Sequence, residues 1–136
     1  ICGLPDGGCR QQFTGGVLTT STATGTHVVR GALLAAWNAS GGEAGPLGHA
    51  TADERCGLRD NGCFQHFQHG STYWSPATGG HWVSGPIRDA WKATGWERGT
   101  LGYPTGDPVT AGNETTQRFQ HGTLALNRTT GQVTRR

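Results

Sequence analysis

The stretch that decides the fold is "FQHGSTYWSPATGGHWVSGPI", Phe67 to Ile87. It holds two short runs suited to strands, separated by the turn "SPATG". In this turn Pro76 presets its own φ, and Gly79 supplies the left-handed residue that closes a hairpin. A helix is predicted over Pro86 to Thr94, with Gly95 at its C-terminal cap. The stretch therefore predicts strand, turn, strand and helix, in that order.

The same pattern occurs more than once in the chain. Shifted by 54 residues, positions 2–54 fall on positions 56–108 with 26 identities in 53 positions and no gap. A partial copy, "RFQHGTLALNRTTGQV" from Arg118 to Val133, follows at a shift of 52 from the second. Such a period indicates a repeat architecture. We predict one domain, residues 1–136, built from three successive units: about 2–55, about 56–113 and, incomplete, about 114–136.

Each full unit carries one apolar stripe at helical spacing. Leu33, Ala36 and Trp37 lie at i, i+3 and i+4 in a helix predicted over Ala32 to Ser40, and the second unit repeats this stripe. A helix this short is not stable alone in water, so it must pack on the hairpins. The predicted fold class is α+β, with tandem β-hairpin-plus-helix (β-β-α) units that share a core.

Composition and charge exclude several classes of protein. The 136 residues include 24 glycines and only 33% hydrophobic residues, which predicts a thin core with many turns. The net charge of +2 comes without a basic block, so we expect no nucleic-acid partner. No apolar run approaches the roughly 18 residues of a membrane span, so we expect no membrane insertion. The opening "ICGLPDGGC" is no signal peptide, so we expect a mature protein or an excised domain.

Two further motifs, together with the opening stretch, resemble the LGFP repeat family. They are "LGYPTGD", Leu101 to Asp107, and its weaker partner "LGHATAD", Leu47 to Asp53, which lacks the proline. The resemblance covers essentially the whole chain. It implies a secreted actinobacterial module, of the kind appended to cell-wall enzymes such as mycolyltransferases, amidases and lysozyme-like hydrolases. It also implies a non-catalytic role in anchoring, through wall glycan of the arabinogalactan or peptidoglycan type. The expected arrangement is a propeller-like ring or, with two and a half units, a partial ring.

The four cysteines are expected to form disulfides. The segment "C-G-L-x-D-x-G-C" occurs twice, so each copy is expected to close on itself, as Cys2–Cys9 and Cys56–Cys63. The rival is a zinc site made by all four thiolates, but zinc ligands usually lie two to four residues apart and six residues intervene here. We therefore expect a disulfide-stapled domain, no metal site, and a secreted or cell-wall location.

No local motif indicates catalysis. The sequence lacks H-E-x-x-H, G-x-S-x-G, S-x-x-K and a P-loop. A glycosidase needs two carboxylates in different environments, whereas the acids here recur at equivalent positions of both full units. We expect Asp53 and Asp107 to cap turns, and Glu43 and Glu97 to bond backbone. No catalytic residue and no cofactor are therefore predicted.

The aromatic residues divide by comparison between units. Trp37 and Trp91 match on the helix stripe and are predicted in the core. Strand alternation places Trp74 on the more apolar face of its strand, so it is also expected to be partly core. Tyr73 and Trp82 have smaller counterparts in the other units, so we expect Tyr73 to be exposed and both rings to belong to a surface that only the second unit carries. Trp96, where the first unit has a glycine, is expected either to lie at the rim of a site or to pack over the next unit.

These residues predict a sugar-binding surface in the second unit. A pyranose lays its C–H face on an aromatic ring while polar neighbours bond its hydroxyls. His27 and His81 recur, and each is expected to bond a neighbouring carbonyl, with a ligand or a metal as alternatives. The candidate ligand-binding residues share this stretch or lie close after it: Tyr73, Trp82, His81, Trp96, Gln68 and His69.

Three functions remain open from sequence. The first is a carbohydrate-binding module that anchors a secreted protein or enzyme to the actinobacterial envelope. The second is a protein–protein interaction or assembly module of a secreted complex, because an unfinished third unit leaves an open edge that a protein partner or a second copy can cover. Two copies would then supply five units, enough to close a ring. The third is an enzyme or an inhibitor.

Overall fold

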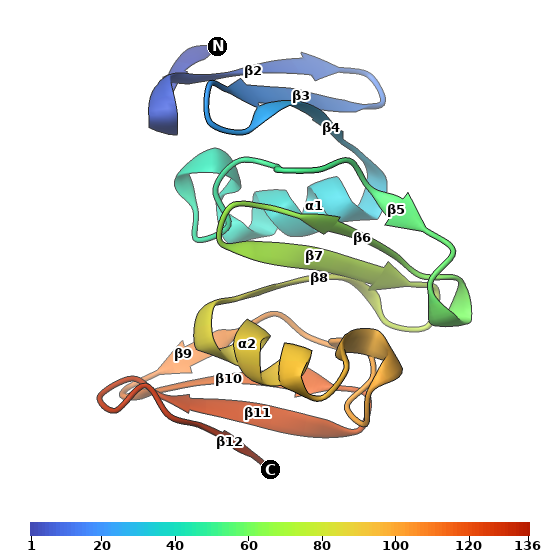
Figure 1. The fold of residues 1–136 in the computed structure, drawn as a ribbon, viewed down its shortest axis with the longest axis vertical. Helices are drawn as coiled ribbons and strands as arrows, with labels where there is room; N and C mark the ends of the chain where they lie inside the picture. The colour runs from blue at the N-terminus through green and yellow to red at the C-terminus, as the bar shows by residue number, and fades with distance from the viewer.

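The computed structural model describes residues 1–136 as three four-stranded antiparallel sheets that alternate with two helices (Figure 1). The elements follow one another along the long axis, and the two termini lie at opposite ends. Helix α1 (Gly31–Ser40) contacts both the first and the second sheet, and α2 (Gly85–Ala93) contacts both the second and the third. The predicted α+β class is confirmed. The predicted propeller-like or partial ring is wrong, because each helix packs between two sheets and stacks the units in a line.

All three sheets run in chain order. The first contains β1 (Cys2–Leu4), β2 (Gly8–Phe13), β3 (Gly16–Ser21) and β4 (Gly25–Val29). The second contains β5 (Arg55–Cys56), β6 (Cys63–His66), β7 (Gly70–Ser75) and β8 (Gly79–Ser84). The third contains β9 (Val109–Ala111), β10 (Glu114–Phe119), β11 (Gly122–Asn127) and β12 (Val133–Arg135). Four 3-10 turns complete the elements: Pro5–Gly7, Gly42–Ala44, Arg59–Asn61 and Trp96–Arg98.

The units contain more strand than the β-β-α pattern predicts. The segment before each phenylalanine forms two strands of its own, and Phe67 lies in the turn between β6 and β7 rather than inside a strand. The third sheet also has its full four strands, and no helix follows it within the 136 residues. Its return strand is displaced by one residue, because Leu126 pairs with Val133 whereas its counterpart Trp74 pairs with Gly80. This slip turns Val133 toward the core.

The predicted turn and cap glycines adopt the left-handed conformation that their positions require. The φ angles of the three hairpin glycines are nearly equal: +77° at Gly25, +76° at Gly79 and +76° at Gly131. At the helix ends the φ of Gly41 is +112° and that of Gly95 is +107°. The local turn chemistry is therefore as the sequence predicts.

Both predicted disulfides are confirmed, and the zinc alternative is excluded. Cys2 pairs with Cys9 across β1 and β2, and Cys56 pairs with Cys63 across β5 and β6. No free cysteine is left. In the third sheet a tight turn at Gly112, with a φ of +60°, joins β9 to β10, and no disulfide links these two strands.

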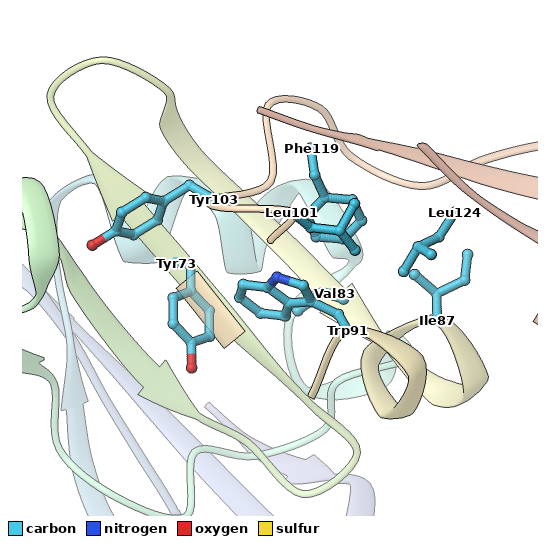
Figure 2. Close-up of a cluster of buried hydrophobic side chains, with 8 residues drawn as sticks. All are labelled: Tyr73, Val83, Ile87, Trp91, Leu101, Tyr103, Phe119 and Leu124. Carbon is cyan, nitrogen blue, oxygen red and sulfur yellow. The ribbon is translucent and has the colours of Figure 1, made fainter. Parts of the chain in front are cut away.

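Two hydrophobic cores fill the spaces between the sheets. The first contains Val17, Val29, Trp37, Leu47, Ala50 and Phe67. The second contains Tyr73, Val83, Ile87, Trp91, Leu101, Tyr103, Phe119 and Leu124 (Figure 2). The two predicted core tryptophans are fully buried. Each also donates its indole N–H over 3.0 Å to a glycine carbonyl, Trp37 to Gly48 and Trp91 to Gly102.

The Leu-Gly motif that ends each full unit joins it to the next. Its residues lie beside the next unit's Phe-Gln-His-Gly turn and form isolated antiparallel bridges, Ala50 with Phe67 and Pro104 with Phe119. At Gly102 the φ is +75°, and a Cβ atom would lie 2.5 Å from Oε1 of Gln120. That oxygen accepts the N–H of Tyr103 at 3.0 Å. Only glycine permits this close approach, which explains the motif.

Two buried glutamine side chains form the polar link between units. The Nε2 of Gln65 donates to the carbonyls of Val28, at 3.0 Å, and Ala52, at 2.9 Å, both in the preceding unit. In the same way Gln117 donates to the carbonyls of Trp82, at 2.9 Å, and Gly106, at 3.0 Å. We call these two residues the glutamine clamps.

We expect Gln65→Leu to lower the free energy of unfolding by about 1–3 kcal/mol, because two backbone carbonyls at the junction lose their side-chain donor. Urea denaturation with the disulfides intact measures this change. The matched control is Gln11→Leu, since Gln11 occupies the same position of the first unit but is exposed and makes no side-chain hydrogen bond within residues 1–136. A midpoint of Gln65→Leu equal to that of the wild type contradicts the role of the clamp.

Candidate functional site

The second sheet does not bring the predicted binding residues together. Strand register pairs Tyr73 with His81 on one face and Thr72 with Trp82 on the other. Tyr73 contacts Trp91 of α2, whereas Trp82 packs against the core that contains α1. Because helices cover both faces, the predicted aromatic patch is divided between two sides of the sheet.

Tyr73 is buried, so the expectation of an exposed ring is wrong. Only 3% of it is accessible, and its ring lies edge-on to Trp91, with 4.6 Å between the ring centroids (Figure 2). It also stacks on Phe64, with 5.4 Å between the centroids. Burial, with a further contribution from the negative charge of Glu97, raises the pKa of Tyr73 above its ordinary value. The small counterparts of Tyr73 in the other units did not indicate exposure, because the second core contains more aromatic rings than the first and encloses this one.

His81 and its counterpart His27 hold the return strands. In His81, Nδ1 lies 3.0 Å from a carboxylate oxygen of Asp107, and Nε2 lies 2.8 Å from the carbonyl oxygen of Thr78. His27 makes the same contacts with Asp53 and Thr24, at 3.0 Å and 2.8 Å. The expected bond to a neighbouring carbonyl is confirmed. The two aspartates contact histidine rings instead of capping turns. Trp82 lies beside His81 on β8 and is half-buried.

Gln68 and His69 lie on the turn that faces the preceding unit. The side chain of Gln68 donates to Asp6 at 2.9 Å and accepts the backbone N–H of His49 at 2.9 Å. His69 donates its backbone N–H to Leu47, and its side chain is exposed. Gln68 therefore connects the first two units, and of this pair only the ring of His69 faces solvent.

The buried glutamates also bond side chains rather than backbone. Glu43 accepts from Thr19 at 2.9 Å and pairs with Arg10 at 3.1 Å. Its counterpart Glu97 lies beside Tyr73 and Tyr103 and makes one looser contact, at 3.7 Å, with Arg98. No cluster of three histidine, cysteine or acidic side chains is suited to hold a metal ion.

The first Leu-Gly motif has Ala50 where the second has Pro104, and both residues bridge to the phenylalanine of the next unit. The residues just before them also make equivalent bonds. His49 donates through Nε2 to the carbonyl of Pro5 at 2.8 Å, and its counterpart Tyr103 donates to the carbonyl of Arg59 at 2.5 Å. Burial, followed by the charge of Glu97, raises the pKa of Tyr103 to about 12. The two units thus use different rings for one bond.

A pocket of about 400 Å³ opens where the first and second units meet. Trp74 forms an aromatic wall, Ala32 and Leu33 of α1 form apolar lining, and Arg30 and Glu54 pair at 2.5 Å. We call it the Trp74 pocket. Trp74 is half-buried and lines this opening, and it belongs to neither of the two hydrophobic cores. Trp74 was not among the binding residues expected from the sequence.

The Trp74 pocket has no equivalent between the second and third units. There the counterparts of Trp74, Arg30 and Glu54 are Leu126, Ser84 and Pro108, and none of them lines a pocket. A half-exposed indole beside an ion pair suits a ligand with an apolar face and hydroxyl groups at its edge. The replacement of Trp74 by Thr20 and Leu126 in the other units was the available sequence signal.

A second group of aromatic and basic side chains lies on the α2 side of the sheet. Trp96 is half-buried, with its ring 6.2 Å from Tyr73 and 6.1 Å from His66. Nδ1 of His66 accepts from the hydroxyl of Ser71 at 2.7 Å and from Arg88 at 3.4 Å. Burial and the nearby charges of Arg88, Arg55 and Lys92 hold the pKa of His66 below its ordinary value.

This lowered pKa predicts a loss of stability in acid. The unfolded chain takes up a proton at the ordinary histidine value of about 6.5, whereas folded His66 resists it, so the free energy of unfolding falls as pH drops below about 7. The counterpart of His66 in the first unit is Gln12. We expect His66→Gln to make the free energy of unfolding less dependent on pH, as measured by urea titrations between about pH 8 and pH 5. His121→Gln, on an exposed turn, is the control. Equal pH slopes for wild type and His66→Gln contradict the prediction.

Comparison with known proteins is consistent with this architecture. The family model described as LGFP repeat matches residues 1–45 and 47–99, which are the first unit and most of the second. No catalytic domain is matched, and no curated protein is similar enough to count as a match. Neither helix is long and apolar enough to cross a membrane. The two disulfides are typical of an extracellular protein. The chain belongs to the LGFP repeat family.

Proposed function

We propose that this chain is a non-catalytic module that binds glycan of the actinobacterial cell wall and holds a secreted protein or enzyme there. The observation that carries the proposal is the Trp74 pocket, an opening with one aromatic wall at the junction of two units. The arabinogalactan and peptidoglycan types of polymer both offer sugar rings with an apolar C–H face.

The chemistry of the pocket fits one sugar ring. Its volume of about 400 Å³ lies within the usual range of small-ligand sites. The indole of Trp74 offers a flat face for C–H groups, and Arg30 and Glu54 supply donors and acceptors for hydroxyl groups. Because Arg30 keeps 64% of its side chain exposed, its remaining N–H groups are free to bond a ligand. We assign the sugar contacts to these three residues.

The residues expected from sequence take other parts in this proposal. Tyr73 packs in the core and supports the sheet, while His81 and Gln68 hold neighbouring segments in place. Trp82 packs on the same face of the sheet as Trp74. A single pocket of this kind binds weakly, so anchoring depends on several modules or several contacts along one polymer.

One observation favours a protein-interaction module as the second candidate. In the second and third sheets, the face toward the preceding unit is covered by α1 and α2. The equivalent face of the first sheet is its outer face, which no helix of residues 1–136 covers and which lies at one end of the stack (Figure 1). Phe13 and Val28 are 49% and 44% exposed beside it, and the clamp position Gln11 is unpaired. A partner helix that repeats the α1 contacts, from another protein or a second copy, fits this face.

We expect Trp74→Leu to weaken binding to purified actinobacterial wall at least tenfold, because leucine, the residue at position 126 of the third unit, removes the stacking face and keeps the strand apolar. Sedimentation of the chain with wall material measures this binding. The control Tyr73→Phe keeps the buried ring and is expected to bind as the wild type does. Unchanged binding by a folded Trp74→Leu variant counts against the pocket as the site.

A further inference from the structure

The second unit gathers basic side chains that form no ion pair with a carboxylate. The Cζ of Arg88 lies 5.0 Å from the ring centroid of Trp96, and the Nζ of Lys92 lies 5.8 Å from it. The charge of Arg55 also acts on the adjacent His66 ring. None of the seven ion pairs in the structure includes these three cations. We call Arg88, Lys92, Arg55, Trp96 and His66 the Trp96 patch.

Arg88 is held in place by groups that leave its charge free. Its Nε donates to the hydroxyl of Ser71 at 3.0 Å, and its Nη2 donates to Nδ1 of His66 at 3.4 Å. Ser71 is fully buried, and both partners lie on strands of the second sheet. A guanidinium has five N–H donors, so three remain without a protein acceptor. A positioned cation with free donors is the geometry of a receptor for an oxyanion.

The first unit shows that the fold does not need this patch. The counterparts of Arg88, Lys92 and Trp96 are Leu34, Asn38 and Gly42, on a helix that begins at the equivalent residue and on the 3-10 turn that follows it. There the glutamate and arginine of the unit pair with each other, as Glu43 with Arg10. The patch is therefore an addition to the second unit rather than a requirement of the repeat.

Trp96 occupies a backbone conformation that is unfavourable for a bulky residue. Its φ is +59°, and the first unit places glycine at this position with a φ of +64°. A residue with a side chain pays on the order of 1–3 kcal/mol there, and such local strain concentrates at functional sites. The strained position turns the indole toward both cations, where the ring face attracts them.

We propose that the Trp96 patch binds the acid groups of an anionic polysaccharide. No pocket includes Arg88, Lys92 or Trp96, so the patch suits one face of an extended polymer better than an enclosed small molecule. The cations bond carboxylate or phosphate oxygens, and the half-buried indole contacts the sugar ring that carries them. Three cations and a net charge of +2 are too few for the many phosphate contacts of a nucleic acid. The site is separate from the Trp74 pocket and does not depend on it.

Affinity electrophoresis tests this site, with polygalacturonate as the carboxylate polymer, a phosphodiester-linked glycan as the phosphate polymer and dextran as the neutral one. We expect the wild type to be retarded by one or both anionic polymers and not by dextran. The variant Arg88→Leu with Lys92→Asn, which takes both residues from the first unit, is expected to bind at least tenfold more weakly. Adding Trp96→Gly is expected to weaken binding further. Retardation is also expected to fall with added salt.

Matched controls separate the patch from general charge effects. The variant Arg118→Leu with Arg128→Asn removes the same charge from the third sheet and its exposed turn, and we expect it to bind as the wild type does. Equal loss in both double variants, or no loss in a folded Arg88→Leu and Lys92→Asn variant, overturns the proposal. Tighter binding to polyglutamate at equal charge assigns the patch to an acidic peptide and also overturns it. The Trp74→Leu variant keeps the Trp96 patch. We therefore expect it to bind the anionic polymers as the wild type does, even if it no longer binds wall material.

Discussion

The buried amide contact between successive units is the interaction on which the stack depends. Each glutamine clamp reaches from the second strand of its sheet to two carbonyls of the preceding unit, and each lies where water is excluded. Without the clamp these carbonyls would lose their side-chain donors, whereas the Oε1 atom of each clamp is buried and has no partner in the protein. The Leu-Gly motif adds backbone bonds beside each clamp, and both junctions use the same set of contacts.

Stacking in a line has a direct consequence for function. The second sheet is covered by a helix on both faces, so its central side chains are core whatever their chemistry. Ligands of the second sheet can therefore reach only its borders. Both candidate sites lie at such borders: the Trp74 pocket beside the start of α1, and the Trp96 patch beside α2.

The first unit serves as an internal reference for the second. Where the two units agree, as in the cap glycines, the core tryptophans and the histidine–aspartate pairs, the residues hold the fold. Where they differ, as at Trp74, Arg88 and Trp96, the fold tolerates the smaller or neutral residue. A departure alone does not indicate a binding residue, because Tyr73 also differs from its counterpart Thr19 and lies in the core.

The sequence by itself determined the repeats, the turns, the helix stripes, the two disulfides and the family, because each depends on residues close together or on comparison between copies. Strand alternation was also right in placing Tyr73 and Trp74 on opposite faces. Which face is buried, and whether units form a ring or a line, depended on how each helix packs between two sheets. Only the tertiary structure placed Tyr73 in the core and opened a pocket beside Trp74, because both result from contacts between units that local spacing does not specify.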